Sequence, residues 1–253
     1  MQPKSLHPWS ITPTQAIEVQ SRLRERLVLS WDNRALTSIA GVDMHLQDNL
    51  AQAAIVVLSY PDLDPIDAVI AACPLTFPYI PGLLAFREGP AFLAAWQYLS
   101  SKPDLVMFDG QGTAHPRGLG LASHMALHIQ RPTIGVAKSR LCGHHEPPGA
   151  HRGDCTPLHR EDDPNCIIGS VVRTREGVSP LFVSPGHLID LQQSIRLVLR
   201  CCTRYRLPEP TRLAHRLAAG KVQAAQLFDT QRRISRPRSS NQNRQHPVTK
   251  SET

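Results

Sequence analysis

The chain contains 253 residues, of which 41% are hydrophobic and 19% charged, so it is long enough to bury a sizeable core and has a globular composition. The formal net charge of +7 favours a polyanionic partner without establishing one. The charge is uneven, because residues 223–253 carry six Lys or Arg and two acids, a net +4 that leaves only +3 for the rest. Basicity alone is therefore a weak argument for a nucleic-acid site in the folded part.

No apolar run approaches the roughly 20 residues that a membrane-spanning helix needs, and no apolar signal segment opens the chain. The six cysteines show no Cys-x-x-Cys spacing, and the His and Cys residues between 142 and 166 lack the paired-ligand pattern of a structural zinc site. We therefore expect a cytoplasmic protein with reduced thiols, no membrane association and no zinc in that segment.

The first element in the chain is a helix whose start is marked by a capping box. Thr12 is a capping residue, Pro13 suits the first helical position, and Gln15 completes the box. Apolar residues at helical spacing predict a buried stripe through to about Leu29. The residues of this stripe are Ile17, Leu23, Leu27 and Val28.

Three apolar stretches separated by polar turns then predict an antiparallel meander. They cover residues 39–46, 54–60 and 66–72. Beyond them, strand and helix alternate, which favours parallel neighbouring strands. The elements expected there are a helix over 88–100 with Pro90 near its start, a strand over 104–109, a helix over 119–129 and a strand over 132–138.

The C-terminal third begins with a Pro-, His- and Gly-rich segment, 143–165, which is expected to be a long loop. Strands over 167–173 and 181–184, a helix capped by Asp190, and a helix that starts near Pro210 and ends before Gly220 follow. The whole pattern predicts a single α/β domain over 1–222 with a mixed β-sheet flanked by helices. This layout is RNase H-like as much as any other mixed α/β fold. Residues 223–253 read as a disordered basic tail.

Two aspartates occupy apolar strands, where an unpaired carboxylate would be costly. Asp43 lies inside the first strand and Asp109 ends a later one, so each needs a cation, a hydrogen-bond network or an exposed strand end. Glu88, at the expected helix start, adds a third acid, although an acid there also complements the helix dipole. Oxygen ligands of this kind suit Mg²⁺ or Mn²⁺. The sequence therefore indicates a metal site next to phosphate.

Other residues have both a functional and a structural interpretation. Tyr79 lies in the stiff Pro-Tyr-Ile-Pro loop, which could hold a wedge against a base stack, but the loop alone favours a tyrosine that packs on its own domain. His115 and Arg117 follow Asp109, and Lys138 ends the neighbouring strand, so these groups could hold a phosphate or remain solvated. His215, within a helix, could be a ligand or a packed residue.

Taken together, these motifs resemble the endonuclease V family, in the family's order over about residues 12–218. The matching blocks are Ile39-Ala-Gly-Val-Asp43, Pro78-Tyr-Ile-Pro-Gly-Leu-Leu-Ala-Phe-Arg-Glu88, Lys102-Pro-Asp-Leu-Val-Met-Phe-Asp-Gly110, His115-Pro-Arg117, Ala122-Ser-His124, Pro132-Thr-Ile-Gly-Val-Ala-Lys-Ser-Arg-Leu-Cys142 and Tyr205-Arg-Leu-Pro-Glu-Pro-Thr-Arg212.

The resemblance implies an RNase H-like DNA repair endonuclease for deaminated bases such as deoxyinosine. It implies Mg²⁺, replaceable by Mn²⁺, and hydrolysis of the second phosphodiester bond 3′ to the lesion, leaving 3′-hydroxyl and 5′-phosphate ends. By the same resemblance Asp43 and Asp109 bind the metal with Glu88 as the third acid. Lys138 is the active-site lysine, and His215 has a metal-side role.

For the substrate, the resemblance implies that Tyr79 fills the space left by the displaced base. It also implies a hypoxanthine pocket, partly built from backbone groups. The pocket residues are Gly82, Leu84, His115 and Gly120. Gln111 stands where many members have His, and the resemblance does not extend to residues 143–165 or to the tail.

Two alternatives remain beside the DNA repair enzyme, which we expect to be a monomer. The first is an endoribonuclease that acts on inosine-containing RNA, because no residue decides the sugar preference. The second is a non-catalytic nucleic-acid binder. The intact set of Asp43, Glu88 and Asp109 argues against the binder.

Overall fold

A mixed eight-stranded sheet forms the centre of the computed structural model, which describes residues 3–228. The strand order across the sheet is β3-β2-β1-β4-β5-β8-β7-β6. The strands are β1 (Ser38–Gln47), β2 (Leu50–Ser59), β3 (Pro65–Pro74), β4 (Leu105–Phe108), β5 (Thr133–Ala137), β6 (Cys155–His159), β7 (Ile167–Val172) and β8 (Leu181–His187).

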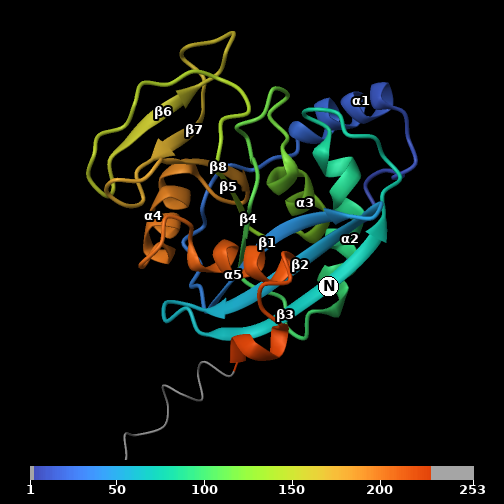
Figure 1. Ribbon diagram of the computed structural model, residues 1–253. Coiled ribbons are helices and arrows are strands. Elements are labelled where there is room, and N and C mark those ends of the chain that lie inside the picture. Colours follow the sequence, from blue (N-terminus) through green and yellow to red (C-terminus); the bar gives the residue numbers. More distant parts are fainter. Residues whose placement is uncertain (1–2, 229–253) are drawn as a thin grey trace, which may run out of the picture.

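The strand pairing confirms the expected mixed sheet. The meander β1–β2–β3 is antiparallel, and β1, β4 and β5 pair in parallel in the middle of the sheet. The remaining strands add on antiparallel, so that the hairpin of β6 and β7 lies at the end of the sheet opposite β3 (Figure 1).

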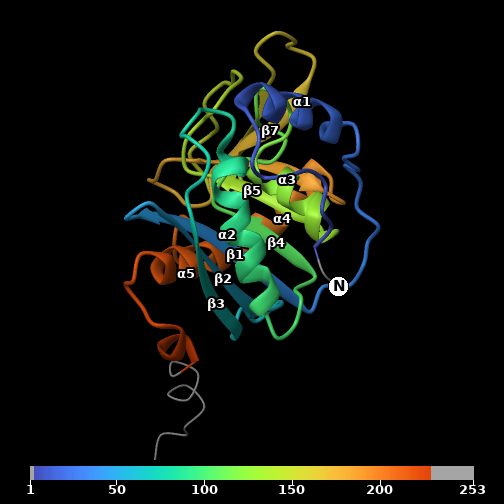
Figure 2. The same cartoon turned by 90° about the vertical axis from the view of Figure 1, so that its right-hand side faces the viewer.

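Among the described residues, four helices lie on the two faces of this sheet, and a fifth, the first in the chain, packs outside two of them. They are α1 (Pro13–Arg24), α2 (Leu84–Tyr98), α3 (Leu121–Ile129), α4 (Leu191–Cys201) and α5 (Glu209–Ala218). Alternate residues of β1 point to opposite faces. Ala40 and Val42 pack with α2 and α3, whereas Ile39 packs with α4. Helix α5 covers β1 and β2 on the same side as α4, and Figure 2 shows α5 and α2 on opposite sides of the meander.

The capping box of Thr12 and Gln15 is present, but α1 ends at Arg24 rather than near residue 29. The predicted stripe was partly wrong, because Ile17 and Val28 are exposed. The face that is buried consists of Ala16, Val19, Gln20 and Leu23. The buried face of α1 therefore includes a polar residue, Gln20, which the predicted apolar stripe left out.

Helix α2 begins at Leu84, four residues before the predicted start, and Pro90 lies inside it. A proline in a helix interior removes one backbone hydrogen bond, which is why Pro90 suggested a helix start. Burial of Ala85, Phe86 and Phe92 in the core outweighs that loss. Glu88 is consequently in the second turn, so the interpretation of it as a first-turn acid that complements the helix dipole is wrong.

The segment 143–165 was predicted to be a loop throughout, yet it contains β6. Apart from an isolated bridge between His144 and His159, this strand pairs only with β7, and Pro157 is tolerated there because an edge strand leaves backbone groups unpaired. Leu158 is its one buried residue. Because β6 has only one buried residue and is mostly exposed, its sequence lacks the apolar pattern that predicts a strand.

The C-terminal part that the structure describes ends at Phe228, with Leu227 buried against Ala214 and Leu217 of α5. The predicted tail, 223–253, lies outside the described residues from position 229 onward. No helix of the described part is long and apolar enough to cross a membrane. All six cysteines lie within that part and are free of disulfides.

Candidate active site

The parallel pairing of β1 with β4 brings Asp43 and Asp109 together. Val42 is opposite Phe108 in this register, and the Asp109 N–H donates to the Val42 carbonyl oxygen at 2.9 Å. Each aspartate directly follows one member of that residue pair. Backbone hydrogen bonds therefore fix both carboxyl groups at the same place in the sheet.

Helix α5 adds His215 to this pair because β1 carries a glycine where the two elements touch. A Cβ on Gly41 would lie 2.0 Å from the Pro210 carbonyl carbon and oxygen, so any side chain would push α5 away. From α5, the His215 Nδ1–H donates to Asp43 Oδ2 at 2.8 Å. One ligand atom from each of Asp43, Asp109 and His215 lies within 4.8 Å of the other two.

Glu88 approaches the same place from α2. It lies outside the 4.8 Å group, and within residues 3–228 its carboxyl group makes no hydrogen bond. Only 6% of its surface is exposed, and burial, followed by the charge of Asp43, raises its pKa to about 8, which Arg87 partly opposes. Asp43, Glu88, Asp109 and His215 are called the acidic cluster below.

The charge distribution in the acidic cluster favours a cation. Burial of Asp43, and then the charge of Asp109, raise its pKa to about 6, which the hydrogen bond from His215 partly opposes. Three carboxyl groups thus share a site with too little positive charge to keep all of them ionised. Carboxylate oxygens with one imidazole nitrogen form a donor set that suits a divalent ion such as Mg²⁺ or Mn²⁺.

Lys138 supplies the one ammonium group of this site. It follows β5 directly, whose Gly135 is opposite Phe108, and its Nζ forms an ion pair with Asp109 Oδ2. An Arg206 guanidinium nitrogen donates to the Lys138 carbonyl oxygen at 3.1 Å and holds that backbone in place. Arg206 lies in the family block Tyr205–Arg212, but the sequence offered no sign of this contact.

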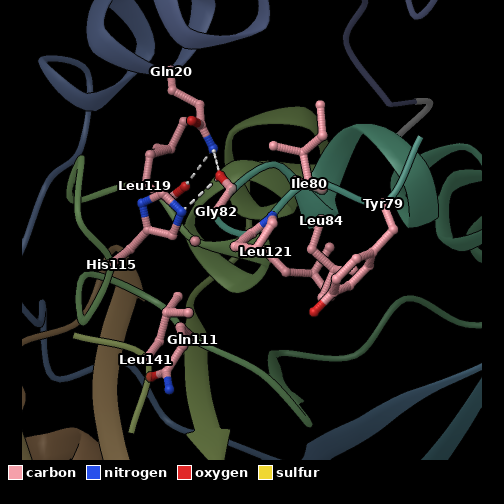
Figure 3. Close-up of a pocket in the computed structure, with 13 residues that line it drawn as sticks. Gln20, Tyr79, Ile80, Gly82, Leu84, Gln111, His115, Leu119, Leu121 and Leu141 are labelled. Atoms are coloured by element: carbon pink, nitrogen blue, oxygen red, sulfur yellow. Dashed lines mark hydrogen bonds between the residues drawn. The ribbon is translucent and has the colours of Figure 1, made fainter. Parts of the chain in front are cut away.

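A cavity of about 110 Å³ lies beside the acidic cluster, since Leu84 and Gln111 of its wall are close in sequence to Glu88 and Asp109. Figure 3 shows the residues that line it. Its walls come from α1, from the loop before α2, from the loop after β4 and from the segment after β5. All five residues for which the sequence implied substrate contact line it. These residues are Tyr79, Gly82, Leu84, His115 and Gly120. The further side chains of the wall include Gln20, Ile80, Gln111, Leu121 and Leu141.

The carbonyl oxygen of Gly82 is a shared hydrogen-bond acceptor that holds the wall of this cavity in place. It accepts hydrogen bonds from Gln20 Nε2 at 2.9 Å, His115 Nε2 at 2.8 Å and Arg117 at 2.7 Å. Gly82 has a φ of +80°, a backbone conformation that favours glycine. Figure 3 shows the bonds from Gln20 and His115 converging on it. The loop before α2 is thereby fastened to both α1 and the loop after β4.

His115 is a neutral imidazole in this arrangement. Its Nε2–H donates to Gly82, while its Nδ1 accepts the Arg117 backbone N–H at 3.1 Å. Burial lowers its pKa to about 4, with a smaller effect of the Arg117 charge. A second proton would leave the Nδ1 acceptor without its lone pair. His115 therefore holds the pocket wall as a neutral group near pH 7.

Tyr79 stands at the cavity rim with 69% of its surface exposed, and in Figure 3 it lies across the pocket from His115. The interpretation that it packs on its own domain is therefore wrong. Gln111 donates its Nε2–H to the Ser139 carbonyl oxygen at 3.0 Å. Its buried Oε1 has no hydrogen-bond partner within the described residues.

Comparison with known proteins identifies the group to which this arrangement belongs. The family model for endonuclease V matches residues 21–216. Endonuclease V of Trichormus variabilis is 47% identical over 219 residues, which cover 85% of this chain and 97% of that protein. The crystal structure of endonuclease V from Streptomyces avermitilis has a TM-score of 0.79 at 41% identity, covering 86% of this chain and 96% of that one.

A second similar structure contains nucleic acid. Endonuclease V of Ciona intestinalis, solved in complex with a 24mer DNA containing an inosine followed by a ribo-adenosine, has a TM-score of 0.71 at 26% identity. The match covers 82% of this chain and 96% of that one. The expected RNase H-like fold is thereby confirmed. The chain belongs to the endonuclease V family, which makes it a nuclease by descent.

Proposed function

We propose that the protein is a Mg²⁺-dependent endonuclease that recognises deaminated bases in DNA, above all deoxyinosine. In this proposal it hydrolyses the second phosphodiester bond 3′ to the lesion and leaves 3′-hydroxyl and 5′-phosphate ends. The family and the Ciona intestinalis complex with inosine-containing DNA support the substrate class. The reaction details rest on the resemblance of the motifs.

One observation carries the proposal: the cavity and the acidic cluster are built on the same two segments. Leu84 lines the cavity and Glu88 belongs to the cluster, four residues apart in α2. Asp109 belongs to the cluster and Gln111 lines the cavity, two residues apart after β4. A base held in the cavity therefore brings its own strand past the carboxyl groups.

The exposed ring of Tyr79 and the cavity suit an enzyme that extracts a base from the stack. Such extraction costs a few kcal/mol and is easiest for a weakly paired base. In this proposal Tyr79 fills the vacated space, while Gly82, Leu84, His115 and Gly120 surround the base. Neutral His115 keeps the wall uncharged, so recognition falls to backbone groups and to the shape of the cavity.

Asp43 and Asp109 would hold the divalent ion, with Glu88 as the third acid and His215 on the side of Asp43. A bound Mg²⁺ supplies positive charge that orients water and stabilises the departing oxygen. Mn²⁺, with the same preference for oxygen ligands, would substitute. Lys138, already paired with Asp109, is placed to neutralise phosphate charge beside the ion.

Inosine-containing RNA is the second candidate substrate, favoured by one observation. The DNA in the Ciona intestinalis complex has a ribo-adenosine directly after the inosine, so that relative accommodates a ribose there. A non-catalytic binder is a weaker alternative, because the acids, Lys138 and His215 all converge on one place.

We further propose one nuclease domain over 1–222 with a basic tail, acting as a monomer in the cytoplasm. The continuous sheet supports a single domain, and the free cysteines suit a reducing compartment. The net +4 of residues 223–253 motivates a role in non-specific phosphate contact. Because Leu227 is buried, a truncation that tests the tail must retain residues up to Phe228.

The test uses end-labelled oligonucleotides with a single inosine, as DNA and as RNA, beside undamaged controls. Each is incubated with the protein in Mg²⁺, in Mn²⁺ and in EDTA, and the cut is mapped on both sides of the inosine. We expect a nick at the second bond 3′ to inosine that requires the metal. Absence of a metal-dependent nick in both sugars would refute both nuclease proposals.

Variants separate recognition from hydrolysis. Asp109→Asn should abolish the nick and retain binding to inosine-containing DNA, because the cavity residues are unchanged. Tyr79→Ala should weaken that binding and retain a slow nick, because the acidic cluster is unchanged. Retained turnover in Asp109→Asn would show that the metal assignment is wrong.

A further inference from the structure

A group of three buried histidines lies outside the acidic cluster and has no part in the proposed reaction. One ring nitrogen from each of His7, His124 and His128 lies within 4.8 Å of the other two. Their exposed fractions are 7%, 0% and 1%. His124 and His128 are one turn apart in α3, whereas His7 comes from the segment before α1. These three residues are called the histidine cluster below.

Backbone carbonyls fix the tautomers of two of these rings. The His7 Nδ1–H donates to the Pro8 carbonyl oxygen at 2.9 Å, and the His128 Nδ1–H donates to the Lys4 carbonyl oxygen at 2.6 Å. Each ring therefore carries its lone pair on Nε2. A metal-bound histidine is held in the same way, with its second ring nitrogen donating to a carbonyl or carboxylate.

Several ring nitrogens of the histidine cluster lack a full set of hydrogen-bond partners within the described residues. His128 Nε2 is buried and has no hydrogen-bond partner within residues 3–228, and the same holds for His124 Nδ1. The Nε2 atoms of His7 and His124 are 2.8 Å apart and can share only one proton. A buried polar atom without a partner is costly, and a cation that accepted these lone pairs would remove the cost.

The surroundings keep the rings unprotonated and enclosed. Burial is the largest cause that lowers the pKa of all three, that of His128 to about 4. The Trp9 ring stacks on His128 with centroids 5.3 Å apart, and Phe86 packs against His124 at 5.1 Å. Neutral imidazoles under an aromatic cover suit an ion that accepts nitrogen ligands and disfavour Mg²⁺, which prefers oxygen.

We propose that His7, His124 and His128 bind one transition-metal ion of the Zn²⁺ type. Two histidines one turn apart on a helix and a third from a separate segment form a common ligand arrangement for zinc. The ion would join the segment before α1 to α3. Helix α3 follows Gly120 and begins with Leu121, and both residues line the cavity beside the acidic cluster. The site is therefore structural and stiffens one wall of the substrate pocket.

The test requires the histidine cluster to be observed apart from the acidic cluster. Full-length protein carrying Asp43→Asn and Asp109→Asn is stripped of metal and titrated with Co²⁺, whose visible absorption reports nitrogen ligands and low coordination number. Zn²⁺ then displaces Co²⁺, and bound zinc is counted by elemental analysis. The same titration on a protein that also carries His128→Phe provides the matched comparison.

We expect one equivalent of ion in the parent protein and an affinity weaker by roughly 100-fold or more in the His128→Phe protein. Zn²⁺ should also raise the melting temperature of the parent protein, which carries Asp43→Asn and Asp109→Asn, and should not change that of the protein with the additional His128→Phe. Mg²⁺ should change the melting temperature of neither protein. No bound equivalent in the parent would overturn the proposal. Equal binding by both proteins would assign the ion to surface histidines and overturn it too.

A second variant covers the case in which His128→Phe does not fold. His7→Phe changes a residue outside every helix and strand, and circular dichroism of the metal-free protein reports whether it is folded. A folded His7→Phe protein that still binds one equivalent as tightly as the parent would refute the site.

Discussion

Glu88 should destabilise the metal-free protein at alkaline pH. Its carboxyl group is buried in α2, faces Asp43 and Asp109, and has a pKa raised from 4.5 to about 8. Between these two values the folded protein binds a proton that the unfolded chain has lost. The free energy of unfolding must therefore decrease as pH rises through this window, and it has lost the full amount above about pH 8.

The magnitude follows from the size of the shift. At 1.36 kcal/mol per pKa unit, the change from 4.5 to about 8 corresponds to roughly 5 kcal/mol. Water entry and movement of the neighbouring charges reduce this figure, so we expect about 2 to 4 kcal/mol. Glu88→Gln removes the ionisation and keeps the shape. In EDTA it should therefore be more stable than the wild-type protein by this amount above pH 8.

The assay is urea denaturation of both proteins in EDTA at several values between about pH 5 and pH 9. The two stabilities should nearly coincide at the acidic end and separate as pH rises. Excess Mg²⁺ should reduce the separation, because a bound cation favours the ionised carboxyl group. Parallel pH profiles for the two proteins would refute the reasoning, since Glu88 would then titrate alike in both states.

Three further predictions concern contacts that position the site. Gly41→Ala should cost about 3 kcal/mol or more of folding stability in thermal melts, because the added Cβ collides with the Pro210 backbone. Gly110→Ala is the control, because the nearest neighbours of its Cβ lie at 3.8 Å or beyond, and it should cost far less in the same melts. Gln20→Leu should weaken inosine discrimination in binding assays by about tenfold, because it removes the hydrogen bonds of Gln20 to Gly82, Leu119 and Arg117 at the cavity wall. It should leave Mn²⁺ affinity unchanged, because none of these partners belongs to the acidic cluster, and an altered Mn²⁺ affinity would contradict this. Truncation after Phe228 should lower the salt dependence of DNA binding, and an unchanged slope would remove the tail from the interface.

The central sheet was predictable because its strands are apolar and its turns polar. Asp43 and Asp109 could be recognised as a pair for the same reason, since a charged residue in an apolar strand is visible in the sequence alone. Their juxtaposition depends on β1 pairing in parallel with β4. The alternation of strands and helices indicated parallel neighbours but not that these two strands pair. Local patterning and the family motifs therefore led to the acids and the cavity residues.

The rest depends on contacts between distant segments that leave no local pattern. Gly41 looks like any strand glycine until Pro210 packs on it. Arg206 lies in the family block Tyr205–Arg212, but nothing in that block indicates that its guanidinium holds the Lys138 backbone. Gln20 occupies a buried helical position that the apolar-stripe analysis left out. Pro90 misplaced the predicted start of α2, because core packing outweighs the usual preference of proline for the first turn. That error led to the interpretation of Glu88 as a first-turn acid that complements the helix dipole.

The separation of four residues between Leu84 and Glu88 lets α2 set a fixed distance between the cavity and the acidic cluster. One turn of a stiff helix separates the cavity wall from the acidic cluster. In the proposed reaction, the rigid backbone therefore sets the offset between the bound base and the bond that is cut. A one-residue insertion there would turn Glu88 by about 100° and shift it by about 1.5 Å, away from the acids. Loops around the cavity can diverge and accept other bases during evolution, while the cutting offset remains constant.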